Sequence, residues 1–206
     1  MYMFRTKRVI TVIAMLAIAL ISISCSNETD TVLASQQKAI ENYLTRSHRP
    51  ALIEERLISE SLDSQPAFYT HWGLNVFRYI STYYNEGRDS MPAVAQGTTI
   101  DIKYSAYTFK SSAPTINDMF ATNDQAKIEE LYRGYDDECI WSTDPMRITV
   151  GKQDLVSGIE TALVGCREGD IVEIYLTYEA AYGKHYIGMV PSNTAVMWNI
   201  EILEVL

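Results

Sequence analysis

The residue types that carry covalent or metal chemistry are scattered along this chain. The sequence contains no triad pattern of nucleophile, base and acid, and no glycine-rich phosphate loop. It has no Cys-x-x-Cys or His-x-x-x-His spacing either, and the three histidines, His48, His71 and His185, lie far apart. We therefore predict no metal and no cofactor, so any catalysis would have to proceed without a metal or an activated nucleophile.

Two smaller groups of reactive side chains leave alternatives open. Asp136, Asp137 and Glu138 form an acidic cluster, which either holds a divalent ion or, as adjacent carboxylates on a loop more often are, is simply solvated. Cys139 and Cys166 either pair as a disulfide, which an oxidising compartment would favour, or stay as two thiols. Their separation in sequence does not decide between these states.

The first 24 residues have the pattern of a secretory signal, with basic residues before an apolar run from Val9 to about Ile23. That run is short for a membrane span, which needs roughly 20 residues. Ser22-Ile23-Ser24-Cys25 resembles a bacterial lipobox, with Ser22 where leucine is usual. We expect residues 1–24 to be a signal peptide, Cys25 to be lipidated and residues 25–32 to form a tether. An uncleaved anchor and ordinary signal cleavage are the alternatives.

Charge narrows the choice of partners. The formal net charge is −9. Removal of the leader would take three basic residues and no acidic ones, which lowers it to −12. Such an acidic chain is repelled by phosphate backbones, so we predict no binding to nucleic acid. The same charge also keeps a tethered protein soluble.

Residues 33–91 form an N-terminal extension in this interpretation. Gln36 to Thr45 has apolar residues at helical spacing, and Leu52 to Leu57 gives a second, shorter helical stripe. Phe68 to Tyr84 is rich in aromatic residues, which suit a pair of strands. These aromatic side chains either pack in a core or bind carbohydrate or peptide.

The remaining chain, residues 92–206, alternates strand patterns with short helical ones. Ile100, Ile102, Tyr104 and Ala106 share one face of a predicted strand. Further strands are expected at Met146 to Val150, Ile171 to Tyr178 and Ala195 to Val205, and a helical segment at Asn123 to Tyr132. Many strands around few helices indicate an α+β fold.

One short helix has clear boundary signals. Ser157 and Glu160 have the spacing of a capping box, in which Ser157 caps the helix and Glu160 reaches back. Ile159, Ala162 and Leu163 form its apolar stripe. Gly165 suits the C-terminal end, so we predict a helix of about two turns with one buried face.

Five short segments in order resemble the FKBP-type peptidyl-prolyl cis-trans isomerases. They are Gly97-Thr98 to Tyr104, Gly151-Lys152-Gln153 to Gly158, Gly165 to Asp170, Ala181-Tyr182-Gly183 and Trp198 to Glu204. The similarity covers about Pro92 to Leu206, with an insertion near residues 123–144. It implies a bent antiparallel sheet wrapped over one short helix, with an apolar pocket between the two.

The resemblance also assigns pocket positions. It implies catalytic roles for Tyr104, Phe120, Val156, Ile159, Tyr182 and Trp198, and substrate-binding roles for Met146, Leu155, Tyr186 and Val190. In the family the backbone N–H at the position of Val156 meets a substrate carbonyl, and the hydroxyl at that of Tyr182 hydrogen-bonds the ligand. Tyr104, Ile159 and Trp198 would be packed in this fold whether or not a ligand binds.

Several pocket positions depart from the family pattern. Ala121 stands where an aspartate usually follows the pocket phenylalanine, and Asp144, near Trp141, could supply a carboxylate instead. Ile159 replaces the usual tryptophan of the pocket floor, and Met146 replaces an aromatic residue. We expect weak binding of the family's macrolide ligands and reduced or absent turnover.

The resemblance implies an isomerase that acts on proline-containing polypeptides, anchored to a bacterial membrane through Cys25 and assisting the folding of exported proteins. The alternative is a catalytically weak or inactive FKBP-like lipoprotein that serves as a protein-binding or chaperone module, because function belongs to the site and not to the fold. A third hypothesis is a surface lipoprotein whose segment Phe68 to Tyr84 binds glycan or peptide.

Overall fold

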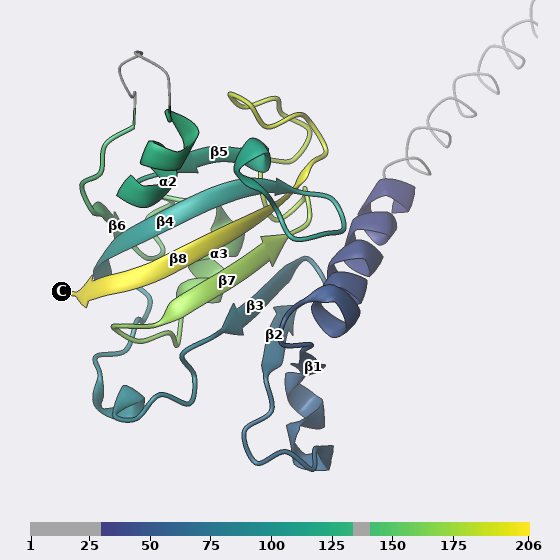
Figure 1. Ribbon diagram of the computed structural model, residues 1–206, viewed down its shortest axis with the longest axis vertical. Helices are drawn as coiled ribbons and strands as arrows, with labels where there is room; N and C mark the ends of the chain where they lie inside the picture. The colour runs from purple at the N-terminus through teal and green to yellow at the C-terminus, as the bar shows by residue number, and fades with distance from the viewer. Residues whose placement is uncertain (1–29, 134–140) are drawn as a thin grey trace, which may run out of the picture. The chain divides into compact units, whose positions relative to one another are not determined.

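The computed structural model describes residues 30–133 and 141–206 (Figure 1). The chain divides into two compact units, Met1–Ser35 and Gln36–Leu206. Of the first unit only residues 30–35 are described, and they are helical. The predicted signal peptide, Cys25, the Asp136–Glu138 cluster and Cys139 lie outside the described residues.

A mixed sheet dominates the second unit, and its order is β1-β2-β3-β7-β8-β4-β5, with β6 also paired to β4. All pairs are antiparallel except β1 with β2. The strands are β1 Ile53–Glu54, β2 Phe68–Trp72, β3 Val76–Ile80, β4 Thr99–Phe109, β5 Met119–Thr122, β6 Met146–Thr149, β7 Ile171–Leu176 and β8 Ala195–Val205. The α+β fold is confirmed.

Few helices accompany this sheet among residues 30–133 and 141–206. They are α2 Gln125–Leu131, α3 Ser157–Leu163, the 3-10 helices Glu55–Glu60, Arg88–Ser90 and Ile116–Asp118, and a helix over residues 30–42 that continues as the π-helix Tyr43–Ser47. Figure 1 shows α3 behind β7 and β8. The predicted helical segment at Asn123 to Tyr132 is confirmed as α2.

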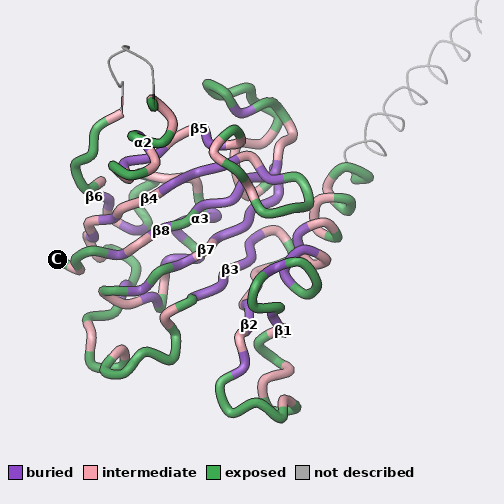
Figure 2. The backbone as a smooth tube through the Cα atoms, in the orientation of Figure 1, coloured by how far each residue is buried: buried purple, intermediate pink, exposed green. Residues whose placement is uncertain are grey.

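Alternating side chains of the long strands build a core on each face of the sheet. Figure 2 shows that long stretches of β4, β7 and β8 are buried. Ile100, Ile102 and Ala106 of β4 are fully buried on the face that holds α3. Tyr107 and Phe109, beyond a β-bulge, belong to the core of the other face. The predicted strand at residues 100–106 and its buried face are therefore confirmed.

The predicted capping box of α3 is wrong. Val156 is the N-cap residue and no side-chain hydrogen bond from a described residue caps the helix, because Ser157 is already its first helical residue. The Glu160 side chain is buried and turns to the preceding loop, where its carboxylate accepts hydrogen bonds from the N–H groups of Gly151 (2.9 Å) and Leu155 (3.3 Å). Glu160 thus holds the loop that leads into the helix, while Gly165, at φ 83°, ends it as predicted.

Close packing of α3 depends on Gly158. A Cβ atom at this position would lie 2.6 Å from the carbonyl oxygen of Ala180 and 2.8 Å from a methyl group of Leu176. Only glycine allows the helix to approach so closely, so Gly158 sets the distance between α3 and the segment after β7.

The N-terminal extension shares the sheet of residues 92–206. The predicted strand pair at Phe68 to Tyr84 is confirmed as β2 and β3, and β3 pairs with β7 along its whole length. Phe77 is fully buried and Tyr79 is 8% exposed in the second core, so these two side chains pack, whereas Tyr83 and Tyr84 of the same segment are exposed. The predicted second helical stripe is instead β1 followed by a 3-10 helix, Glu55–Glu60.

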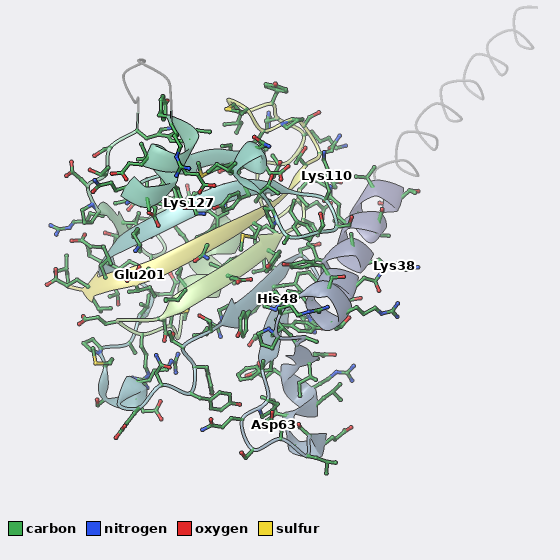
Figure 3. All side chains as sticks on the ribbon, viewed as in Figure 1. Lys38, His48, Asp63, Lys110, Lys127 and Glu201 are labelled. Carbon is green, nitrogen blue, oxygen red and sulfur yellow. The ribbon has the colours of Figure 1, made fainter. Side chains whose placement is uncertain are left out.

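Buried polar contacts hold the segment from Gln36 to Pro50 against the sheet. The Gln36 side chain accepts a hydrogen bond from the Tyr178 N–H (2.9 Å). His48 lies where this segment meets the sheet (Figure 3), and its two ring nitrogens contact the Pro50 carbonyl oxygen and the Glu173 carboxylate. Burial lowers the pKa of His48, but the hydrogen bonds to Glu173 and Pro50 outweigh this effect and raise it overall. The raised pKa favours the imidazolium, which can donate to both acceptors.

Candidate active site

Four aromatic rings meet on the α3 face of the sheet. Tyr104 of β4 stacks on Trp198 of β8 with ring centroids 5.1 Å apart. Phe120 of β5 stands edge-on to Trp198 at 6.2 Å and to Tyr182, in the segment after β7, at 6.0 Å. The four rings form a connected group, which we call the aromatic cluster, so four residues that the resemblance assigned to a pocket do come together.

Strand register explains this arrangement. Trp198 pairs with Ala106 and Ile200 pairs with Tyr104, so Tyr104 and Trp198 are diagonal neighbours on one face. Between β4 and β5 the register shifts after Ala106, opposite Phe120. Such a bulge re-aims a side chain, and here the Phe120 ring turns toward Trp198 and Tyr182.

Aliphatic side chains pack in the same core as the cluster. Ile159 of α3 is fully buried in the same core as Trp198, which is 4% exposed. Three more predicted residues, Met146, Leu155 and Val156, are half-buried against that core. The core that carries the cluster is therefore lined by apolar side chains from α3, from the residues just before it and from β6.

The two remaining predicted residues both lie in the loop before β8, but only one of them is buried. Val190 is 1% exposed and belongs to the core. Tyr186 is 72% exposed, so its ring faces solvent and not the cluster. Ile187 and Met189 in the same loop are also exposed, which makes its surface apolar.

Two hydrogen-bond donors at the site have no acceptor among the described residues. One is the backbone N–H of Val156, at the N-terminal end of α3, and the other is the hydroxyl of Tyr182. Burial, with a smaller contribution from Tyr104, raises the pKa of Tyr182 to about 12, so its hydroxyl stays protonated at neutral pH. The site thus combines apolar walls with two donors that no described residue engages and that can bind carbonyl groups.

The cluster also contains one buried hydrogen-bond donor that was not predicted from the sequence. The Trp198 indole N–H has less than 1 Å² of exposed surface and no hydrogen-bond partner among the described residues. Ala121, as expected, brings no polar group. Asp144 lies in an adjoining cleft with Tyr104, Trp141 and Met146, so the carboxylate sits beside the cluster and not within it.

Other chemistry is sparse in the described part of the chain. No group of three or more His, Cys, Asp and Glu side chains could hold a metal ion there. Cys166 is buried and unpaired among the described residues, and burial raises the pKa of its thiol to about 11. Within residues 30–133 and 141–206, no helix has the length and apolar character needed to cross a membrane.

Comparison with known proteins adds one match. A family model described as FKBP-type peptidyl-prolyl cis-trans isomerase matches residues 93–203, just over half of the chain. The matched region starts shortly before β4 and includes the aromatic cluster, α3 and nearly all of β8. A search among curated proteins finds no match.

Proposed function

Since this chain belongs to the FKBP-type peptidyl-prolyl cis-trans isomerases, we propose that it isomerises X–Pro bonds of exported proteins while anchored in a bacterial cell envelope. The isomerase activity and the binding of proline-containing peptides belong to the family. The anchored location and the exported substrates are proposed in addition, from the sequence of residues 1–25.

The chemistry asks little of the protein beyond selective binding. Resonance gives the amide C–N bond a rotational barrier of roughly 18–20 kcal/mol. Rotation breaks this resonance and reduces the charge separation of the carbonyl group. An apolar site favours that less polar twisted amide over the planar one, and each preference of about 1.4 kcal/mol accelerates rotation tenfold.

The aromatic cluster supplies the apolar walls in this mechanism. The proline ring lies among Tyr104, Phe120, Tyr182 and Trp198, over Ile159. The Val156 N–H and the Tyr182 hydroxyl hold the carbonyl groups that flank the proline. The absence of acceptors for these two donors among the described residues is the observation that carries the proposed roles.

Replacing Tyr182 by phenylalanine should weaken the binding of a proline peptide about two- to tenfold, the effect of one lost hydrogen bond of roughly 0.5–1.5 kcal/mol. The free energy of unfolding should hardly change, because the hydroxyl has no partner among the described residues. Isothermal titration and urea denaturation of the full chain measure both quantities. Tyr186→Phe, a change on the 72% exposed tyrosine of the same loop, is the matched control. Equal affinities of the Tyr182→Phe variant and the parent would remove Tyr182 from the site.

The envelope location rests on the basic residues, apolar run and Ser22-Ile23-Ser24-Cys25 sequence at the start of the chain. A thioether-linked lipid on Cys25 would hold the protein at the membrane, whereas Cys25→Ala would remove the attachment atom. We expect the parent in the membrane fraction and the Cys25→Ala variant, once cleaved, in the soluble fraction. A cleaved Cys25→Ala variant that still sediments with membranes would contradict lipid anchoring.

A further inference from the structure

We propose that the cleft beside the aromatic cluster binds a lysine or arginine side chain next to the substrate proline, and so makes the enzyme prefer basic sequences. This inference rests on the proposed function of the site. The cleft has a volume of about 310 Å³ and shares Tyr104 and Met146 with the site. Trp141 and Asp144 complete the walls on which the argument depends.

The residues that line the cleft come from β4, from the end of β5 and from the start of β6 with the residues just before it. Figure 1 shows the chain leaving the sheet after β5 and returning to it as β6. Here β4 changes partners, from β6 at Ile102 to β5 at Ser105, and Tyr104 sits in the gap between them. Successive residues of an extended peptide are about 3.3–3.6 Å apart. A residue next to a proline in the cluster is therefore within reach of this cleft.

Asn123 closes the gap and fixes the rim of the cleft. Its side-chain oxygen accepts a hydrogen bond from the Tyr104 N–H (2.7 Å), and its amide nitrogen donates to the carbonyl oxygens of Ile102 and Asp144 (both 3.0 Å). Asn123 is 6% exposed, so these bonds are shielded from water. The backbone of Asp144 is thus tied through the Asn123 side chain to the strand that carries Tyr104.

The carboxylate of Asp144 is also oriented in advance. The Ser142 hydroxyl donates to Asp144 Oδ2 (2.9 Å) and accepts a hydrogen bond from the Asp144 N–H (3.0 Å). No Lys, Arg or His among the described residues forms an ion pair with Asp144. The Asp144 carboxylate therefore has a fixed orientation and no described cation beside it, so it can form an ion pair with a cationic group of a ligand.

The other walls fit the stem of a basic side chain. Asp144 is the one charged residue that lines the cleft among the described residues. The rings of Trp141 and Tyr104 and the thioether of Met146 offer apolar surface, along which lysine and arginine lay their methylene groups. Aromatic faces also attract the cation itself. The net charge of −9 favours the approach of basic segments and opposes acidic ones.

The test compares the isomerisation of short peptides by the purified full chain. Exchange rates are measured by NMR, because a protease-coupled assay would add the sequence preference of the protease. One peptide series varies the residue before the proline and another the residue after it, each with Lys, Arg, Leu and Glu. We expect Lys and Arg to exceed Glu in kcat/KM by roughly fivefold in at least one series, the gain of an exposed ion pair. This preference should shrink as salt is raised.

Asp144→Asn should abolish most of the preference and leave the rate for the Leu peptides unchanged. Glu130→Gln is the matched control, because it removes one negative charge from α2 without lining the cleft. Catalysis of all peptides without a charge preference, or a preference that survives Asp144→Asn, would overturn this inference and leave the isomerase in place. If no peptide is isomerised, the proposed function fails, and titration of the same peptides decides the preference of the cleft separately.

Discussion

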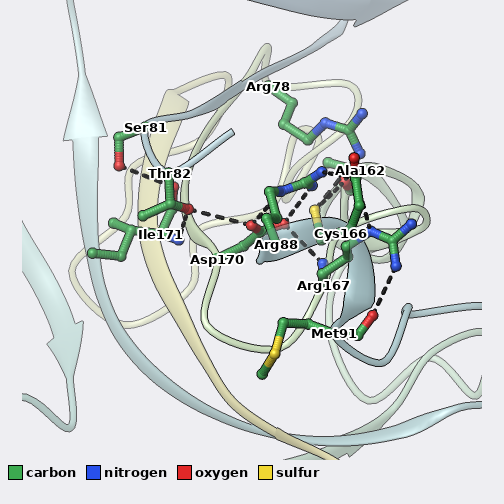
Figure 4. A network of polar contacts seen from close by, with 11 residues as sticks. Arg78, Ser81, Thr82, Arg88, Met91, Ala162, Cys166, Arg167, Asp170 and Ile171 are labelled. Atoms are coloured by element: carbon green, nitrogen blue, oxygen red, sulfur yellow. Dashed lines mark hydrogen bonds and ion pairs between the residues drawn. The ribbon is translucent and has the colours of Figure 1, made fainter. Parts of the chain in front are cut away.

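Replacement of Asp170 by asparagine is expected to lower the free energy of unfolding by roughly 3–5 kcal/mol, the usual cost of breaking a buried ion pair on one side. Asp170 is 1% exposed, and its two carboxylate oxygens accept hydrogen bonds from Arg88 Nε and Nη2, each at 2.7 Å (Figure 4). The Arg167 N–H (2.8 Å) and the Thr82 hydroxyl (3.3 Å) also donate to it. Asparagine would remove the buried counter-charge of the Arg88 guanidinium, whose side chain is 9% exposed, and leave it only the distant Asp89 carboxylate among the described residues, 4.0 Å away and 96% exposed.

A second pair in the same protein provides the matched control. Asp101 accepts from Arg147 Nε (2.8 Å) and Nη2 (2.7 Å), nearly the same two-point geometry. The Arg147 side chain is 63% exposed, so water and salt screen this pair and Asp101→Asn should cost far less stability. Urea denaturation of the parent and both variants gives the comparison. Similar losses for the two variants would show that burial is not what makes the Asp170 pair important.

The Asp170 pair matters because it holds the connection that joins the N-terminal segment to the rest of the sheet. Arg88 belongs to the chain between β3 and β4, and Asp170 directly precedes β7, the partner of β3. Nearby, Arg78 of β3 donates from Nη1 to the carbonyl oxygens of Ala162 (2.8 Å) and Val164 (2.9 Å), at the C-terminal end of α3 (Figure 4). A cation at this end satisfies carbonyl groups that a helix leaves unpaired. The N-terminal extension thus stabilises the helix that carries Ile159.

Local patterns in the sequence were sufficient to predict the strands and helices that bury one face. Alternation predicts β4, and the apolar stripe with Gly165 predicts α3, because each pattern depends on residues close in sequence. The order of short segments around them implied the pocket, and Tyr104, Phe120, Tyr182 and Trp198 are indeed adjacent.

Pairings between distant segments could not be read in the same way. The contacts of Arg78 with the end of α3 join residues 84 and 86 positions apart, and no local periodicity encodes them. Asn123 looked like the start of a helix, whereas its amide fills a gap between strands that exists only in the folded sheet. Glu160 fits a capping box by spacing, yet the nearby N–H groups of Gly151 and Leu155 take its carboxylate.

Ile159→Trp is expected to lower the free energy of unfolding by about 1–3 kcal/mol, and Trp198→Phe in the same chain should restore part of that loss. The family to which the chain belongs usually has tryptophan at the first position and phenylalanine at the second. Here the larger ring comes from β8 and the aliphatic side chain from α3, and both are buried in one core. Because protein interiors are close-packed, we expect a second indole in this core to need space that the first indole now fills.

Trp198→Phe alone should cost less than most reductions of a buried ring. It leaves a cavity, but it also removes an indole N–H that has no partner among the described residues, and an unpaired buried donor is itself unfavourable. Urea denaturation of the parent, both single variants and the double variant forms a thermodynamic cycle. A coupling energy of about 0.5–3 kcal/mol in favour of the double variant would show that the two positions share one volume. Additive effects would mean instead that Ile159 and Trp198 pack independently, and the site would then owe its shape to each position separately.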